Sequence, residues 1–166
     1  MLSRLKDRTI EKTMNSTIAR FIIVAIILCY FQAALSEIDI NQCDAYRKKS
    51  NELLCNDSGY LVSFGERYCR KFVEKNDLFS EYGQMVLADI RSCLISGIKS
   101  EENLTCDNAK DIAQEHHYNC YLESGYCSLG FFDRIEIGWV VRKELFDADY
   151  IHLINKISTA CALGFN

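Results

Sequence analysis

Residues 79–120 read FSEYGQMVLADIRSCLISGIKSEENLTCDNAKDIAQEHHYNC and contain the two clearest helical patterns of the chain. In the first pattern the residues that recur at intervals of three or four are Phe79, Tyr82, Val86, Ile90 and Cys93. This spacing places one apolar stripe along a helix. We expect Asp77 to cap its amino end and Gly97 to end it.

The second pattern follows a loop from Ile98 to Cys106 and begins after Asp107, which we expect to be the capping residue. Its stripe consists of Ala109, Ile112, Ala113, His116 and Cys120. Cys93 and Cys120 are therefore both expected to face the core. Two such helices packed as a hairpin can bring these two thiols together.

Shorter helical patterns lie on both sides of this hairpin. We expect helices over Asp39–Cys55, Leu61–Glu74 and Arg134–Phe146, and a last helix whose buried residues step from Tyr150 through Ile154 and Ile157 to Cys161. A polar turn at residues 55–59 separates the first two. The chain has no proline, so no residue of this type interrupts a helix. The predicted fold is an all-α, compact, disulfide-stapled bundle of short helices.

The amino-terminal residues indicate export. The run FIIVAIILCYF at residues 21–31 follows Arg20 and precedes Ala34-Leu35-Ser36, whose small outer residues suit signal peptidase. We expect residues 1–36 to be a signal peptide, with residues 1–13 as an upstream extension if translation starts at Met14. A retained signal anchor is the alternative, but 11 apolar residues are too few to span a bilayer well.

Removal of residues 1–36 changes both the cysteine count and the charge. The full chain of 166 residues has nine cysteines and is 49% apolar, with 19 Lys and Arg against 23 Asp and Glu. The mature chain, residues 37–166, keeps an even number of cysteines, namely Cys43, Cys55, Cys69, Cys93, Cys106, Cys120, Cys127 and Cys161. It has 14 basic and 21 acidic residues and therefore a net charge of −7. An acidic chain of this kind is a poor candidate for binding nucleic acid or an anionic membrane.

Eight cysteines in an exported chain indicate up to four disulfides, for which the sequence alone allows about 105 connectivities. The chain from Cys69 to Cys127 resembles the stanniocalcin family of secreted glycoprotein hormones. The resemblance rests on the phrases FSEYGQ (79–84), SCLISGIKS (92–100), NCYLESGYC (119–127) and YIHLINKISTAC (150–161). It also rests on gaps of 23, 13 and 6 residues between successive cysteines of the pairs 69/93, 106/120 and 120/127.

This resemblance implies a specific disulfide pattern for residues 37–166. It implies the pairs Cys43 with Cys69, Cys55 with Cys106, Cys93 with Cys120, and Cys127 with Cys161. The intersubunit cysteine of the family has no counterpart here, so we expect a monomer or a noncovalent homodimer. The family also implies a hormone-like regulator of calcium and phosphate handling, with an extracellular receptor or a secreted metalloprotease as its partner.

Two glycosylation sequons lie beside cysteines in the mature chain, at Asn56 and Asn103. We expect both to lie in exposed turns. We also expect the exposed faces of residues 47–52, which include Arg47-Lys48-Lys49, and of residues 107–115 to contribute to partner binding. The competing interpretation is a secreted defence, venom or host-directed effector on the same scaffold.

The remaining functional class is an enzyme. The sequence His117-Tyr118-Asn119-Cys120-Tyr121 resembles the His-Asp-x-Cys-Tyr element of secreted phospholipases A2. Tyr118 stands where those enzymes carry the calcium-binding aspartate, and no glycine-rich calcium loop precedes it. His116 fits a core position, while Asp147 and Asp149 fit the start of the last helix better than a weak calcium site with Glu144. We therefore expect no catalytic residue, metal site or cofactor.

Overall fold

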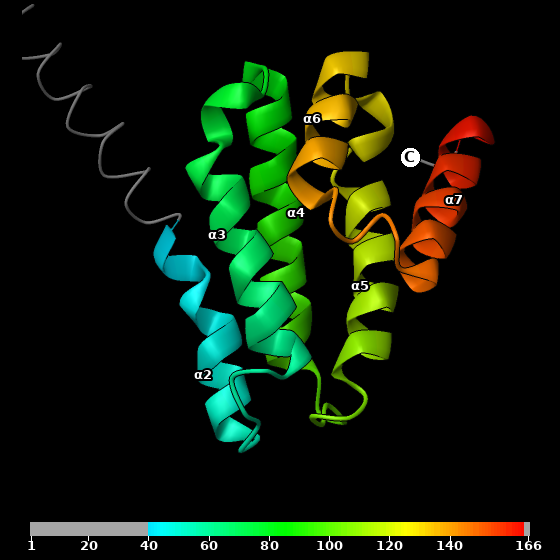
Figure 1. Ribbon diagram of the computed structural model, residues 1–166. Helices are drawn as coiled ribbons and strands as arrows, with labels where there is room; N and C mark the ends of the chain where they lie inside the picture. Colours follow the sequence, from blue (N-terminus) through cyan, green and yellow to red (C-terminus); the bar gives the residue numbers. More distant parts are fainter. Residues whose placement is uncertain (1–39, 165–166) are drawn as a thin grey trace, which may run out of the picture. The chain divides into compact units, whose positions relative to one another are not determined.

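The computed structural model describes residues 40–164, in which every regular element is helical and no strand is present. The helices are α2 (Asp44–Glu52), α3 (Arg67–Glu74), α4 (Glu81–Ser100), α5 (Ala109–Glu123), α6 (Phe131–Val141) and α7 (Ala148–Ala162). Three shorter helical turns connect them, namely η1 (Leu61–Glu66), η2 (Asn76–Leu78) and η3 (Tyr126–Ser128). The prediction of an all-α, disulfide-stapled bundle is confirmed for this part of the chain (Figure 1). The predicted signal peptide lies outside the described residues.

Helix α4 is the longest element and differs from its prediction at both ends. Ser80, not Asp77, caps its amino end, because the Ser80 hydroxyl accepts a hydrogen bond from the Gly83 amide at 3.0 Å. Asp77 lies in η2. The helix also continues past Gly97 to Ser100. A Cβ at Gly97 would lie 2.7 Å from Nδ1 of His116, so the glycine serves the close packing of α5 on α4 and does not end the helix.

The buried face of α4 is also shifted from the predicted stripe. Val86, Leu87 and Ile90 are buried, but Tyr82 is 43% exposed. Tyr82 lies near the end of α4 at which the core gives way to solvent, and its hydroxyl lies near Gly125. The predicted inward position of Tyr82 is therefore wrong.

Helix α5 packs against α4 as the predicted helical hairpin. Its preceding residue is Asn108 and not Asp107, so the predicted cap is wrong. Asn108 Oδ1 accepts a hydrogen bond from the Thr105 amide, which closes the turn before the helix. Ala109 and Ala113 are buried, and so is Cys120. The small alanines allow α5 to approach its neighbours closely.

The predicted helix over Leu61–Glu74 is one helical run whose first six residues form the π-helical turn η1. A Cβ at Gly65 would lie 2.6 Å from the ring of Tyr46, so this glycine permits close contact between η1 and α2. Helix α2 lies inside the predicted range of Asp39–Cys55 and is followed by Leu54 with a positive φ of 57°.

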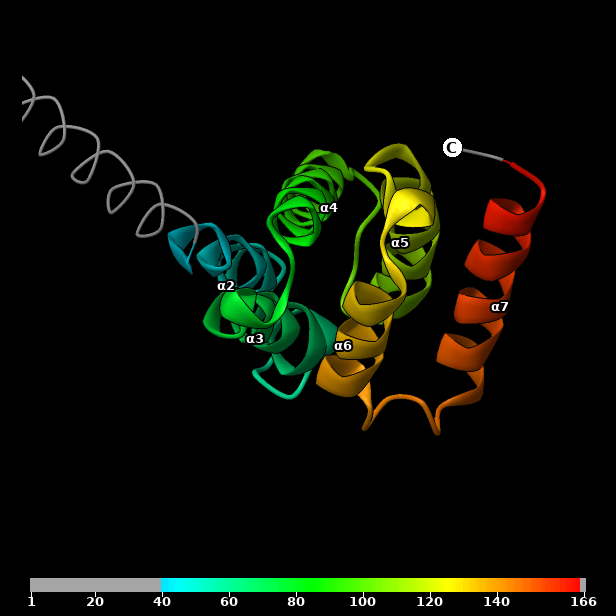
Figure 2. The same cartoon turned by 90° about the horizontal axis from the view of Figure 1, so that it is seen from above.

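Helices α6 and α7 lie on the side of α5 and α3 that is remote from α2 (Figure 2). Helix α6 starts three residues before the predicted Arg134 and ends at Val141, where a series of turns begins. Asp147 caps α7 as predicted, since its carboxylate accepts a hydrogen bond from the Asp149 amide at 2.9 Å. Leu153 lies in the buried position predicted for Ile154, which is 39% exposed.

Four disulfides connect the helices. They join Cys43 to Cys69, Cys55 to Cys106, Cys93 to Cys120, and Cys127 to Cys161. These are the pairs that the family resemblance implies. The first three lie within residues 43–120, and the fourth joins η3 to α7. All eight cysteines expected in the mature chain are thus oxidised.

Candidate binding site

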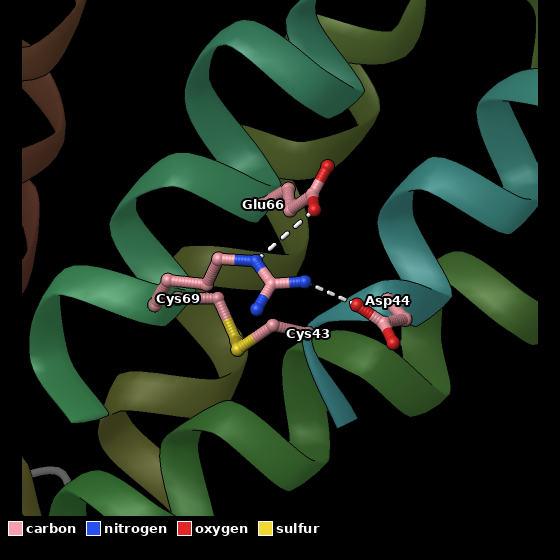
Figure 3. Close-up of a disulfide and its surroundings, with 5 residues drawn as sticks. Cys43, Asp44, Glu66 and Cys69 are labelled. Atoms are coloured by element: carbon pink, nitrogen blue, oxygen red, sulfur yellow. Dashed lines mark hydrogen bonds and ion pairs between the residues drawn. A yellow bond between two sulfur atoms is a disulfide. The ribbon is translucent and has the colours of Figure 1, made fainter. Parts of the chain in front are cut away.

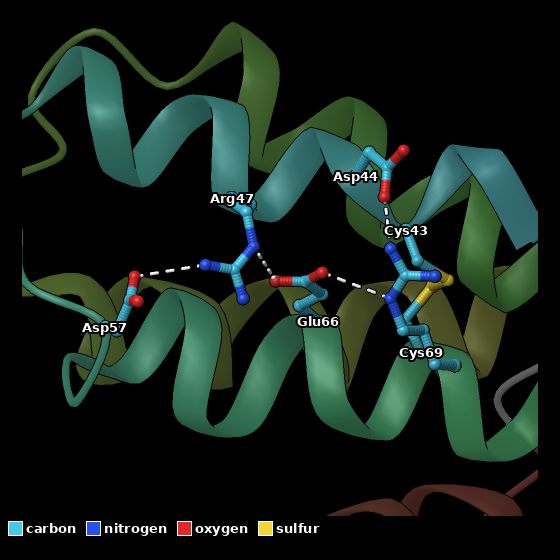
Figure 4. A network of polar contacts seen from close by, with 7 residues as sticks. Cys43, Asp44, Arg47, Asp57, Glu66 and Cys69 are labelled. Atoms are coloured by element: carbon cyan, nitrogen blue, oxygen red, sulfur yellow. Dashed lines mark hydrogen bonds and ion pairs between the residues drawn. A yellow bond between two sulfur atoms is a disulfide. The ribbon is translucent and has the colours of Figure 1, made fainter.

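The first predicted contact face, residues 47–52, is largely held by ion pairs within the protein. A row of alternating charges joins α2 to η1 and α3 (Figure 4), and its members are Asp57, Arg47, Glu66, Arg70 and Asp44. The Arg47 guanidinium lies 3.1 Å from Asp57 and 2.9 Å from the buried Glu66. Figure 3 shows that the end of the row between Asp44 and Glu66 lies beside the Cys43–Cys69 disulfide. The row therefore ties the first two helical segments together, and the exposed Lys48 lies outside it.

The second predicted face, residues 107–115, contains a similar internal contact. Lys110 Nζ lies 3.1 Å from a carboxylate oxygen of Asp147 and 2.7 Å from one of Asp149. The hydrogen bond from Lys110 lowers the pKa of Asp147. Lys110 thus holds the start of α7 against α5. Asp111 and Glu115 remain exposed.

The sequons both lie in exposed positions. Asn56 follows Cys55 in the turn after α2, and its side-chain oxygen accepts a hydrogen bond from the Ser58 hydroxyl at 2.6 Å. Asn103 lies in the loop between α4 and α5. Both asparagines are thus placed where a glycan would meet solvent, which is the position predicted for them. Their use stays a prediction.

Sequence reasoning missed the most unusual surface of the protein, which lies on α6. We call it the α6 apolar stripe and define it as Phe131, Phe132, Ile135 and Trp139. Phe132 is 80% exposed and Trp139 is 58% exposed. The Arg142 guanidinium lies over the Trp139 ring at 4.3 Å from its centroid. The recurrence of Phe131, Ile135 and Trp139 every four residues was visible in the sequence, but a helix predicted to begin at Arg134 excluded the two phenylalanines.

A different face of α6 borders an apolar cleft of about 220 Å³. Its apolar lining comes from η1, α3, α5, η3, α6, α7 and the turns between α6 and α7. It consists of Phe64, Tyr68, Phe72, Tyr121, Tyr126, Ile137, Gly138, Val141, Leu145, Tyr150, Leu153, Ile154 and Ile157. His117, Arg134 and Glu144 complete the lining. We call this space the α6–α7 cleft. No sequence pattern marks it, because its walls come from six separate elements.

Aromatic stacking shapes the inner wall of the cleft. The Phe64 ring stacks on Tyr150 at a centroid distance of 4.8 Å and on Tyr60 at 5.0 Å. The Tyr150 hydroxyl donates a hydrogen bond to the Tyr60 hydroxyl at 3.3 Å. Burial raises the pKa of Tyr60, Tyr121 and Tyr150. These phenols therefore remain protonated and neutral at physiological pH.

His117 lies in the same wall, and a hydrogen bond and two aromatic neighbours surround its ring. Its Nδ1–H donates a hydrogen bond to the Ala113 carbonyl at 2.6 Å, and its ring contacts Phe64 and Tyr121. Burial is the main cause that lowers its pKa, so the imidazole is neutral near pH 7. Tyr118, the residue in the position of the phospholipase aspartate, has Lys156 Nζ above its ring at 3.9 Å. The hydrogen bond and the two ring contacts fix the orientation of the His117 imidazole.

His116, the other histidine of this pair, is half-buried on α5, and its Nε2 lies 3.6 Å from Glu101. Among residues 40–164, no group of three or more His, Cys, Asp or Glu side chains is arranged to hold a metal ion. Within the same residues, no helix combines the length and apolarity needed to cross a bilayer.

Cationic side chains gather at one end of the cleft. Arg67 and Lys71 lie over the Tyr68 ring, at 4.7 and 4.6 Å from its centroid. The Tyr68 hydroxyl donates to Glu144 at 2.5 Å, and Arg67 lies 2.8 Å from the same carboxylate. Burial and this hydrogen bond raise the pKa of Tyr68 to about 12. The cleft thus has apolar walls and a charged rim.

Comparison of the chain with protein-family models, with curated proteins and with solved structures gave no match.

Proposed function

We propose that this chain is a secreted, disulfide-stapled protein that acts by binding another protein through the α6 apolar stripe. The observation that carries the proposal is the exposure of Phe132 and Trp139 on a helix whose other face is buried. Large aromatic residues that face solvent on a rigid scaffold are typical of interaction surfaces. The four disulfides supply that rigidity.

The charged residues beside the stripe indicate what kind of partner surface it would bind. Arg142 stacks on Trp139, and the exposed Lys143 follows it in the sequence. Tryptophan and arginine are the residues most enriched in binding hot spots. The complementary surface is therefore an apolar groove with acidic residues at its border. An extracellular receptor or a secreted metalloprotease with such a groove is the proposed partner.

The resemblance to stanniocalcin supplies the biological role in this proposal. A hormone-like regulator of calcium and phosphate handling needs a persistent extracellular scaffold and a specific protein contact. The coincidence between the disulfides of the structure and the pairs that the resemblance implies supports this role. Both sequons are exposed, which supports a glycoprotein.

The test is capture of partners from extracellular fluid with three forms of the mature protein. The unmodified protein is compared with Trp139→Glu, and with Met85→Glu as the matched control, because Met85 is 55% exposed on α4. We expect an extracellular receptor or metalloprotease that is enriched by the unmodified protein and by Met85→Glu but not by Trp139→Glu. Equal capture by all three folded forms would contradict the proposal.

A further inference from the structure

The α6–α7 cleft is too large to be an ordinary packing defect. Interiors of proteins rarely contain voids larger than a water molecule, and an apolar cavity of about 150 Å³ already accepts benzene. By proportion, the cleft of about 220 Å³ has room for roughly nine carbon atoms. Its walls are almost entirely aromatic and aliphatic, so the part of a ligand that it accepts is apolar.

The rim of the cleft sets the charge of the ligand. Arg67 and Lys71 lie over the ring of Tyr68, and Arg67 also contacts Glu144, so both cations lie beside residues that line the cleft. Burial lowers the pKa of Lys71, and the nearby Arg67, Lys143 and Arg142 lower it further. Arg134 is the basic residue of the lining itself. Among the described residues that line the cleft, Glu144 is the only acidic one, and it already contacts Arg67 and the Tyr68 hydroxyl. This excess of positive charge stands out in a chain that is acidic as a whole.

We propose that the α6–α7 cleft binds a small amphiphile with one carboxylate head group and an unbranched apolar tail of about ten carbons. The tail lies along Phe64, Tyr121 and Gly138, and the carboxylate lies at the rim beside Lys71 and Lys143. Carboxylate binds ammonium and guanidinium groups through charge-assisted hydrogen bonds. A cationic ligand would gain from the aromatic walls but would meet like charges at the rim.

Titration calorimetry on the oxidised mature protein with three probes of equal tail length tests the charge. The probes are decanoate, 1-decanol and decyltrimethylammonium. We expect decanoate to bind with a one-to-one stoichiometry and the other two to bind about tenfold more weakly. Absence of decanoate binding, or equal or tighter binding of the cationic probe, would overturn the proposal. Uptake of decanoate only in many copies per chain would also overturn it, because that result indicates a nonspecific surface.

Gly138 allows the cleft to be filled from within. A Cβ at this position would meet nothing within 4 Å, although the residue lies in a helix that packs against the core. We expect Gly138→Phe to abolish decanoate binding and Gly138→Ala to weaken it by a smaller factor. Unchanged decanoate binding in folded Gly138→Phe would overturn the location of the site.

The rim is tested separately, so the outcome does not depend on the folding of Gly138→Phe. We expect the double variant Lys71→Gln/Lys143→Gln to bind decanoate about tenfold more weakly and to bind 1-decanol as before. Lys48→Gln, on the exposed face of α2, is the matched control and should not change either affinity. An equal loss with Lys48→Gln would overturn the assignment of the rim.

Discussion

Different interactions stabilise two regions of the protein, residues 40–123 and residues 124–164. The first region, which we call the stapled half, contains three of the four disulfides and a core cluster formed entirely within it. The second, the open half, contains α6 and α7, and a single disulfide, Cys127–Cys161, joins its two ends. Of the thirteen large apolar side chains that are exposed among the described residues, nine belong to the open half.

This difference assigns stability mainly to the stapled half and the exposed recognition surface to the open half. Cys43 and Leu61 in the stapled half are almost completely buried, so substitutions there should destabilise the fold. The open half carries the α6 apolar stripe and supplies one wall of the α6–α7 cleft, whose other wall comes from η1, α3 and α5 of the stapled half. An apolar surface of this kind would be a liability on an unsupported helix. The stapled half therefore supports α6 and allows its apolar stripe to stay exposed to solvent.

Removal of disulfides should produce the largest effects and should separate the two halves. The Cys55–Cys106 bond closes a segment of 51 residues, and its replacement by Cys55→Ser/Cys106→Ser should cost about 4 kcal/mol of unfolding free energy. Cys127→Ser/Cys161→Ser should cost nearly as much in denaturant titration. Hydrogen exchange should distinguish them, because loss of the second bond should expose α7 amides and leave α4 amides protected. Equal loss of protection in α4 and α7 would contradict the division.

Two leucine-to-alanine changes should show a smaller difference in unfolding free energy between the two halves. Leu61 is 2% exposed in the core of the stapled half, and Leu61→Ala should cost roughly 3 to 4 kcal/mol. Leu153 borders the α6–α7 cleft, so its side chain makes fewer packing contacts that truncation can remove. Leu153→Ala should therefore cost about 2 kcal/mol. Urea denaturation of both variants measures the difference. A larger cost at Leu153 would show that the cleft is closed in solution.

Two glycines in helix interiors should respond with opposite signs. Gly138→Ala places a methyl group in open space and should stabilise the protein by about 1 kcal/mol through helix propensity. Gly97→Ala places one 2.7 Å from His116, so the ring must move, and the change should be destabilising. Thermal denaturation of both variants gives the comparison. Stabilisation by both changes would indicate that α4 and α5 can separate to accept the methyl group.

The smallest expected effect is a pH dependence from His117, which lies where the two halves meet. Burial holds its folded-state pKa below the unfolded value of about 6.5. The unfolded chain therefore binds more protons below that pH, and stability should fall as pH decreases from about 6.5 toward the folded pKa. His117→Phe should remove this part of the slope in denaturation midpoints measured from pH 7 to pH 5. An identical slope in the variant would assign it to other groups.

The sequence predicted the features that depend on local periodicity. The helical hairpin of α4 and α5 follows from apolar spacing, and the meeting of Cys93 and Cys120 follows from the faces of those helices. Helix ends were predicted less well, because several polar residues near each end can act as the cap. Ser80 competes with Asp77, and Asn108 competes with Asp107. Only the packing of neighbouring elements decides between them.

The candidate sites were not predictable in the same way. The stripe on α6 needed the correct start of that helix, and β-branched residues at 135, 137, 140 and 141 obscured it. The cleft depends on how far α7 stands from α6, which no local pattern encodes. Charged runs such as Arg47-Lys48-Lys49 were more conspicuous in the sequence, yet Arg47 is neutralised by Asp57 and Glu66. Runs of charged residues in the sequence therefore did not predict which surface is available for binding.

Disulfide mapping of the protein, purified without reductant, by mass spectrometry tests the central claim most directly. The claim is that internal bonds consume all eight cysteines and so leave a rigid surface for recognition. The account predicts four linked peptide pairs, including Cys93 with Cys120 in the stapled half and Cys127 with Cys161 in the open half. A free thiol at any of these positions, or a bond from Cys93 or Cys120 to Cys127 or Cys161, would contradict it.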